Sequence, residues 1–271
     1  MYEKIFLIDS GAKCGHFQMW LDETLAINFD SLTHTLGERV ALLRFYTWQP
    51  FCISLGHHQK EDMFDRTRLA QEGIDLVRRP TGGRAVFHAE ELTYAIVANT
   101  EASNATCYAQ IARALQAGLA VLGIKASFQR QQPDFRNRYT RAESLPCFTA
   151  SARDELEVQG KKIIGSAQRR YGKTLLQHGS ILLSPKHREM TRYLSTTDDI
   201  KARIAKDLEE KTTSISEVIG KTIRYDEATQ AFRAGFEQAW QLILEPLCEA
   251  DLLALLPEYS RTVTLDIAPH Q

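Results

Sequence analysis

Cys147 and Lys162 are the two residues whose types and spacing could support covalent chemistry. They lie in the segment PCFTASARDELEVQGKKIIGSAQ and are 15 positions apart (162 − 147 = 15). A cysteine attacks as the thiolate, and a free thiol, with a pKa of about 8.5, is mostly protonated at neutral pH. A nearby ammonium favours the thiolate and lowers that pKa. The pair therefore predicts an activated nucleophile, provided that the fold brings the two side chains together.

A β-hairpin is the element that would return Lys162 toward Cys147. Residues 155–159 and 161–167 have the pattern of two strands that turn near Gly160. The preceding stretch, 129–145, is polar, rich in arginine and almost without periodicity. We predict a mobile loop there, which would suit an enzyme that admits two protein substrates in turn.

A second candidate constellation is RRPTGGRAVFH, from Arg78 to His88. Its adjacent glycines permit positive φ and a close approach of the backbone to a ligand. Its three arginines could bind a carboxylate or a phosphate. The alternative is a tight turn between two strands with solvated arginines, and the residues alone favour neither interpretation.

Small residues and a histidine mark two further strand-like runs. In KKIIGSAQ, the run Gly165-Ser166-Ala167 could leave room for a ligand or permit a close strand crossing. In LQHGSILL, His178 could act as a base or bind substrate, although a lone histidine beside glycine is more often structural.

The composition is that of an ordinary soluble globular protein. The chain has 271 residues, of which 44% are apolar and 25% charged, and a net charge of −1. This balance gives no global signature of nucleic-acid or membrane binding. We see no signal peptide, membrane span or CxxC pair, so we expect a cytoplasmic protein without a zinc site or disulfides. The four cysteines other than Cys147 are expected to be small buried hydrophobic residues.

The hydrophobic pattern predicts a mixed α/β or α+β domain on a largely antiparallel sheet. Helical spacing covers 17–29, 65–72, 105–122 and 226–244, with Asp226 as an N-cap, and a short helix is expected at 251–256. Strand patterns cover 1–9, 39–48, 51–55, 74–79, 92–98 and 175–183.

Taken in order, RRPTGGRAVFH, ELTYAIV, GKKIIGSAQ and LQHGSILL resemble the biotin/lipoate protein ligase catalytic superfamily. Within it, PCF followed by DELEVQGKKIIGSAQ looks like the cysteine-dependent octanoyltransferases of lipoate biosynthesis. The resemblance covers about residues 5–245 and implies a catalytic domain at 1–248, with its core at about 36–245. Residues 249–271 would be a C-terminal tail. The stretch TASARDEL lacks a proline often seen in that family, and the C-terminal end does not match it.

The resemblance also implies a reaction. Cys147 would take an octanoyl group from acyl carrier protein as a thioester and pass it to a lysine of a lipoyl-domain protein, such as the glycine cleavage H protein. Lys162 would lower the Cys147 pKa. No cofactor, metal, nucleic acid or membrane is implied, and a monomer is expected. The residues expected to bind substrate are Arg79, Thr81, Gly82, Gly83, Arg84, His88, Gly165, Ser166, Ala167, Gln168 and His178.

Three other functions remain open at this point. An octanoylated H protein could be the donor, which would make the protein an amidotransferase between lipoyl domains. An ATP-dependent lipoate–protein ligase would use the same scaffold through an acyl-adenylate and would need no cysteine. A non-catalytic protein could dock lipoyl domains or acyl carrier protein without turnover.

Overall fold

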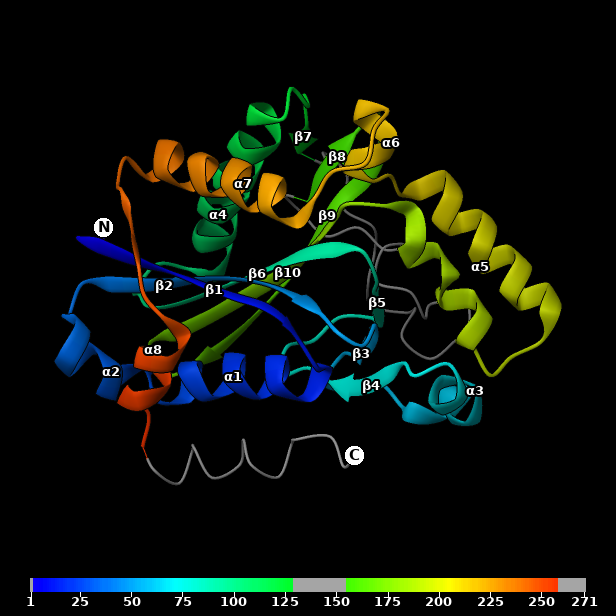
Figure 1. Cartoon of the computed structure of the whole chain (residues 1–271), viewed down its shortest axis with the longest axis horizontal. Coiled ribbons are helices and arrows are strands. Elements are labelled where there is room, and N and C mark those ends of the chain that lie inside the picture. Colours follow the sequence, from blue (N-terminus) through cyan, green and yellow to red (C-terminus); the bar gives the residue numbers. More distant parts are fainter. Residues whose placement is uncertain (1, 129–154, 258–271) are drawn as a thin grey trace.

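The computed structural model of the chain describes residues 2–128 and 155–257, and within them eight strands form a central sheet. The strands are β1 (Lys4–Lys13), β2 (Val40–Trp48), β6 (Glu91–Asn99), β7 (Ser127–Phe128), β8 (Leu156–Val158), β9 (Lys161–Tyr171), β10 (Thr174–Leu182) and β11 (Leu244–Pro246). Their order is β11-β1-β2-β6-β10-β9-β8-β7. The only parallel pairs within this described sheet are β1–β2 and β1–β11. The predicted mixed α/β fold with a mostly antiparallel sheet is confirmed (Figure 1).

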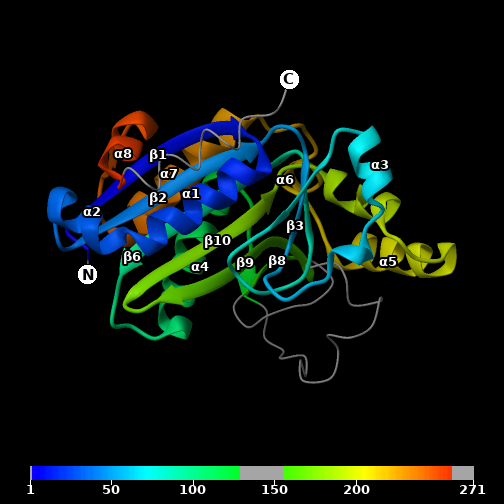
Figure 2. The ribbon, with the colours of Figure 1, turned by 90° about the horizontal axis from the view of Figure 1, so that it is seen from below.

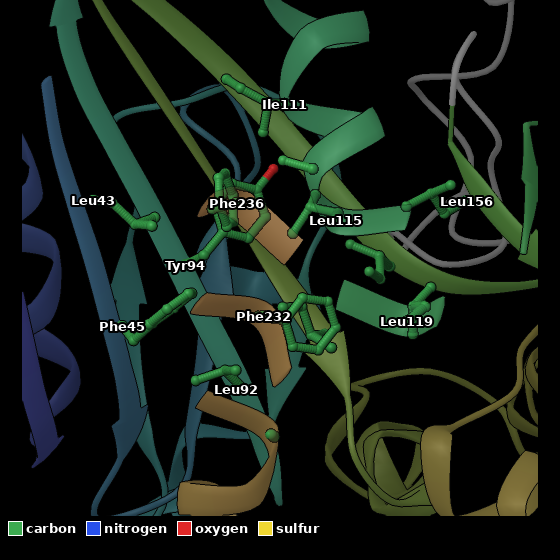
Figure 3. Packing of buried hydrophobic residues seen from close by; sticks show 14 of the residues in the cluster. Leu43, Phe45, Leu92, Tyr94, Ile111, Leu115, Leu119, Leu156, Phe232 and Phe236 are labelled. Carbon is green, nitrogen blue, oxygen red and sulfur yellow. The ribbon is translucent and has the colours of Figure 1, made fainter. Parts of the chain in front are cut away.

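Helices cover both faces of this sheet, as Figures 1 and 2 show. One face carries α4 (Asn104–Val121) and α7 (Tyr225–Trp240); the other carries α1 (Gly15–Ile27), α2 (Phe29–Leu36) and α8 (Glu249–Leu255). Phe45 and Tyr94 from the sheet pack with Phe232 and Phe236 of α7 in a buried cluster (Figure 3). Because both faces are covered, central strands such as VALLRFYTW are apolar almost throughout.

The two helices on the first face touch backbone to backbone. A Cβ atom placed on Gly235 of α7 would lie 2.2 Å from the backbone nitrogen of Gly118 on α4. A side chain at this crossing would push the helices apart, so the pair of glycines sets how closely they approach.

A smaller sheet stands beside the main one. Its strands are β3 (Cys52–Leu55), β4 (Asp75–Arg78) and β5 (Val86–His88), in the order β4-β3-β5. Around it lie the 3₁₀ helices η1 (Glu61–Met63) and η4 (Pro185–Tyr193), with α3 (Arg66–Gln71) and α5 (Asp198–Lys211); α6 (Ile215–Ile219) follows. The sequence predicted strands at 51–55 and 74–79 but not that they form a sheet of their own.

Some boundaries differ from the predicted ones. The expected helix 226–244 ends at Trp240, because Gln241 takes a left-handed conformation and Leu244 pairs with β1. The prediction of Asp226 as N-cap is wrong. Arg224 occupies that position, its backbone N–H donates to Glu227, and Asp226 pairs with the Arg224 guanidinium.

The cysteines divide by burial. Cys52 and Cys107 are buried, as expected, and burial raises the pKa of the Cys52 thiol. Cys14 is only partly buried and Cys248 is exposed, so the expectation is wrong for these two. Cys147 and the predicted loop 129–145 lie outside the described residues. No helix in the described ranges is both long and apolar enough to cross a membrane.

Candidate active site

The β8–β9 hairpin positions Lys162, as predicted. The chain turns at Gln159 and Gly160, both in the left-handed region with φ of 53° and 76°. The turn returns Lys162 to Glu155, whose Oε1 lies 2.6 Å from the lysine Nζ. The two side chains are 2% and 4% exposed respectively, so this is a buried ion pair. Glu155 therefore stabilises a positive charge that would be costly to bury alone.

A pocket lies where the main sheet, the small sheet and α1 meet. Its cavity volume is about 30 Å³, and its surface is predominantly apolar. Six of the predicted substrate-binding residues line it: Arg79, His88, Gly165, Ser166, Ala167 and His178. The rest of the wall, which was not predicted, consists of Met19, Tyr46, Trp48, Ser54, Val86, Thr93, Gly179 and Ser180.

Close packing of β9 against β10 explains part of the small-residue run. Gly179 pairs with Ser166 across the two strands. A Cβ on Gly179 would lie 2.4 Å from the Gly165 carbonyl oxygen and 2.7 Å from the Tyr94 ring. Both interpretations of the run Gly165-Ser166-Ala167 therefore apply. The run permits a close approach of β9 to Gly179 of β10, and its three residues also border the pocket.

His178 is held by two hydrogen bonds, one on each ring nitrogen. Nδ1 lies 2.9 Å from Asp22 Oδ2, and Nε2 lies 2.7 Å from Thr81 Oγ1. Burial alone would raise the pKa of the Asp22 carboxyl, but Arg44, His178 and Tyr46 outweigh that effect and hold it below its ordinary value. An ionised carboxylate only accepts, so Nδ1 carries a proton and donates to Asp22.

His88 is held in the same manner by a different carboxylate. Nδ1 lies 2.7 Å from Glu91 Oε1, and Nε2 lies 2.7 Å from Ser54 Oγ. The ring also stacks on Trp48, with centroids 4.0 Å apart and planes 19° apart. Two histidines in the pocket wall thus each bridge a buried carboxylate and a hydroxyl group.

The paired arginines of RRPTGGR hold the turn together. Arg78 donates to the carbonyl oxygens of residues 56, 57 and 59, at 2.6 to 3.1 Å. Arg79, which is 5% exposed, donates to the carbonyls of Ser54, Gly82 and Arg84, at 2.7 to 3.1 Å. Both guanidinium groups therefore bind main chain, Arg79 as a buried side chain and Arg78 as an exposed one that also pairs with Glu61.

The other predicted residues lie around the pocket rather than in its wall. Thr81 is fully buried behind His178, Gly82 and Gly83 are exposed in the turn, and Arg84 is partly buried. Gln168 lies farther along β9, where its amide nitrogen donates to Gln177 Oε1 at 2.6 Å. The structure brings most of the motif residues to one region and leaves Cys147 outside the described ranges.

The supporting charges were missed at the sequence level. Arg44 and Asp22, 1% and 0% exposed, form an ion pair beneath the pocket, and Glu91 is 1% exposed. A signal was available, because Arg44 interrupts the apolar strand VALLRFYTW and Asp22 follows Leu21 on a helix with a buried face. A charge inside a buried element usually has a partner nearby.

Comparisons with known proteins show to which family the chain belongs. The family model "Lipoyl protein ligase A/B catalytic domain" matches residues 16–237. A protein named Octanoyltransferase LipM from Symbiobacterium thermophilum is 37% identical over 247 residues, covering 89% of this chain and 88% of that protein. The protein of the same name from Bacillus subtilis is 34% identical over 253 residues, covering 88% and 87%.

Solved structures show the same fold at low identity. A bipartite lipoate protein ligase from Thermoplasma acidophilum superimposes with a TM-score of 0.71 at 18% identity, over 97% of this chain and 91% of that one. A lipoate-protein ligase A bound with ATP gives 0.69 at 18% identity, over 98% and 94%. From the family match and the relatives above 30% identity, the chain belongs to the lipoyl protein ligase A/B catalytic domain family.

Proposed function

We propose that this octanoyltransferase moves the octanoyl group of acyl carrier protein to a lipoyl-domain lysine through a Cys147 thioester. The observation that carries the proposal is the similarity, over almost the whole chain, to several proteins named octanoyltransferase. Cys147 and Lys162 add the chemistry, because a thiol near an ammonium is the arrangement that an acyl-thioester route requires.

The reaction has two steps with balanced bonds. The Cys147 thiolate attacks the octanoyl thioester, the new C–S bond forms, and the thiol of the carrier protein leaves. The neutral amine of the acceptor lysine then attacks the Cys147 thioester, the amide C–N bond forms, the amine loses its proton, and the Cys147 thiolate is released. The first step exchanges one thioester for another and the second forms an amide, so neither step needs ATP.

Lys162 is proposed to favour the thiolate. Its ammonium is buried and is held by Glu155 at 2.6 Å. Glu155 itself lies eight positions after Cys147 in the chain (155 − 147 = 8). A fixed positive charge in a buried region acts more strongly on a neighbouring thiol than a solvated one would. Gly165, Ser166 and Ala167, three to five positions farther along β9 and at the pocket wall, support a role in holding the acyl group.

The apolar pocket is proposed to receive the octanoyl chain. Its wall includes Met19, Val86, Trp48 and the two histidines, and its surface is predominantly apolar. A hydrocarbon chain gains about 0.8 kcal/mol for each buried CH₂ group, so such a pocket would supply binding energy for both steps. We propose a monomeric, cytoplasmic enzyme without a cofactor, with acyl carrier protein as donor and a lipoyl-domain protein such as the H protein as acceptor.

The test is intact-protein mass spectrometry after mixing with octanoyl-loaded acyl carrier protein in the absence of ATP. We expect one octanoyl adduct on the wild type, which a lipoyl-domain acceptor discharges. Cys147→Ala should form no adduct. Cys248→Ala is the matched control, because Cys248 is an exposed thiol and its variant should be acylated like the wild type.

Alkylation rates test the role of Lys162. We expect Lys162→Ala to slow iodoacetamide modification of Cys147 at pH 6.5 to 7.5, because less thiolate is present. Lys161→Ala is the matched control, since Lys161 points to the Glu209 carbonyl at 2.8 Å. Equal rates in the wild type and Lys162→Ala would remove Lys162 from this role. Acylation that requires ATP would identify a ligase, and acylation only from octanoylated H protein would identify an amidotransferase.

A further inference from the structure

We propose that the pocket selects plain hydrocarbon acyl chains against chains that carry a hydroxyl group, and that Glu91 and Asp22 are the positioning residues responsible. This inference deepens the proposed function, since it takes the pocket as the acyl site. Neither carboxylate lines the pocket; each lies just behind the wall. Their effect is to draw the N–H and O–H groups of the wall away from the space that the chain would occupy.

Glu91 collects four donors from four different side chains. Oε1 accepts from His88 Nδ1 at 2.7 Å and binds the Thr93 hydroxyl. The Trp48 Nε1–H is shared between Oε1 at 3.0 Å and Thr93 Oγ1 at 2.8 Å. Oε2 accepts from the hydroxyl group of Ser180. Three of these donors meet Oε1 and one meets Oε2, and all four belong to the pocket wall.

Asp22 does the same on the other side of the pocket. Oδ2 accepts from Tyr46 at 2.7 Å and from His178 at 2.9 Å, while Oδ1 pairs with Arg44. The second nitrogen of His178 is bonded to Thr81. Tyr46 and His178 therefore present ring carbons to the pocket and direct their polar hydrogens into the protein.

The remaining polar side chains of the described wall are also engaged with protein partners. Ser54 Oγ bonds with His88 at 2.7 Å and with Arg79 at 3.2 Å, and Arg79 donates further to main-chain carbonyls. Ser166 Oγ lies 2.7 Å from the Tyr94 hydroxyl. These bonds explain how a wall with nine side chains of N–H or O–H type can have a predominantly apolar surface.

A hydroxyl group on the acyl chain would meet this surface at a cost. It would give up its hydrogen bonds to water and enter a space whose described donors are already committed. The proposed discrimination is therefore one of polarity rather than of shape. Apolar pockets reject an added hydroxyl by about 10²-fold in kcat/KM, and we expect roughly 10- to 100-fold here.

The first experiment compares substrates on the wild-type protein. Transfer is measured with octanoyl thioester and with eight-carbon thioesters in which one hydroxyl is moved along the chain. The corresponding free acids are measured by calorimetry, a binding readout that does not depend on transfer. We expect the hydroxylated forms to be weaker by 10- to 100-fold in both assays. Values within about threefold at every hydroxyl position would overturn the proposal.

Variants separate polarity from pocket size. Ser180→Ala removes the hydroxyl that occupies Glu91 Oε2, which opens an acceptor to a hydroxylated chain; we expect the discrimination to fall about tenfold. Glu91→Gln should lower it as well, since an amide cannot accept all four donors. Val86→Ala is the matched control, because it enlarges the pocket without adding or releasing a polar group. Its discrimination should remain that of the wild type.

The outcomes distinguish this inference from the proposed function. Discrimination between the free acids without any acyl transfer would uphold the pocket assignment and defeat the transferase mechanism. Acyl transfer without discrimination between the chains would uphold the transferase mechanism and defeat the proposed selectivity of the pocket. If Glu91 were merely structural, Glu91→Gln would weaken all substrates equally and leave the ratio unchanged. If the ratio of activity between plain and hydroxylated chains were unchanged in Ser180→Ala as well, Glu91 would have no role in this discrimination.

Discussion

The two faces of the central sheet differ in what they bury. Toward α4 and α7 the sheet presents Leu43 and Phe45 to an apolar cluster. Toward α1, the intervening residues Arg44 and Tyr46 of the same strand enter a buried polar network. Because side chains alternate along a strand, β2 supplies one apolar cluster with Leu43 and Phe45. Its opposite side supports the candidate site with Arg44 and Tyr46, and Leu42 on that side joins a second apolar cluster.

The physical costs of the two faces are also different. On the apolar face, burial itself is favourable, and the requirement is that the packed surfaces have complementary shapes, as at the Gly118–Gly235 crossing. On the polar face, burial of charge is unfavourable and is offset only when each group meets its partner. Loss of one partner should therefore be more damaging there than loss of a comparable contact on the apolar face.

The largest expected effect is on the polar face. Asp22→Ala leaves the Arg44 guanidinium, 1% exposed, without its opposite charge. Removing one partner of a buried pair costs about 3–5 kcal/mol, so we expect a loss of that size in the free energy of unfolding measured with urea. The control is Lys206→Ala, which breaks an exposed pair with Glu210 and should change stability by less than about 0.5 kcal/mol. Similar losses in the two variants would erase the distinction between buried and exposed pairs.

A second effect should appear on acidification. His187, behind the small sheet, is buried and hydrogen-bonded to Thr212. Burial, and to a smaller extent Arg188, lowers the pKa of His187 to about 4. Ser184 and Glu217 act in the opposite direction but do not outweigh these effects. Between pH 6.5 and 4 the unfolded chain binds a proton that the native state does not, so stability falls as the pH falls. The shift corresponds to about 3 kcal/mol across that window.

Urea unfolding at several pH values checks this expectation. The free energy of unfolding of the wild type should fall more steeply from pH 6.5 to 4 than that of His187→Gln, which has no group to titrate there. Parallel curves would show that His187 is protonated equally in both states. The Asp22 carboxyl, whose pKa is lowered, contributes at a lower pH, below its unfolded value of about 3.9.

The smallest of these effects concerns the apolar face. Gly235→Ala would place a methyl group 2.2 Å from the Gly118 nitrogen and 2.5 Å from its Cα atom, so α4 and α7 must separate. We expect a loss of about 1–3 kcal/mol in the free energy of unfolding, although alanine is the better helix former. Gln238→Ala, at an exposed position of α7, should be neutral or slightly stabilising. A stabilised Gly235→Ala would mean that the crossing is looser than its geometry indicates.

By itself, the sequence determined the class of fold, most strands and helices, and the hairpin that carries Lys162. These follow from local causes: the period of apolar residues and the turn chemistry of Gly160. The motifs also located six residues of the pocket wall, because small residues and histidines are uncommon in buried strands. The assignment of Cys147 as the nucleophile remains a prediction from sequence.

Only the tertiary structure decided which charges meet. Asp22 and His178 are 156 positions apart and Glu91 and Ser180 are 89 apart, and no local pattern links such distant partners. The same holds for Arg78 and Arg79 of the RRPTGGR turn, which resemble an anion site in sequence yet bind main-chain carbonyls in the fold. The physical reason is that a buried polar group is defined by its partners, and those are brought together by packing across the whole sheet rather than by neighbours in the chain.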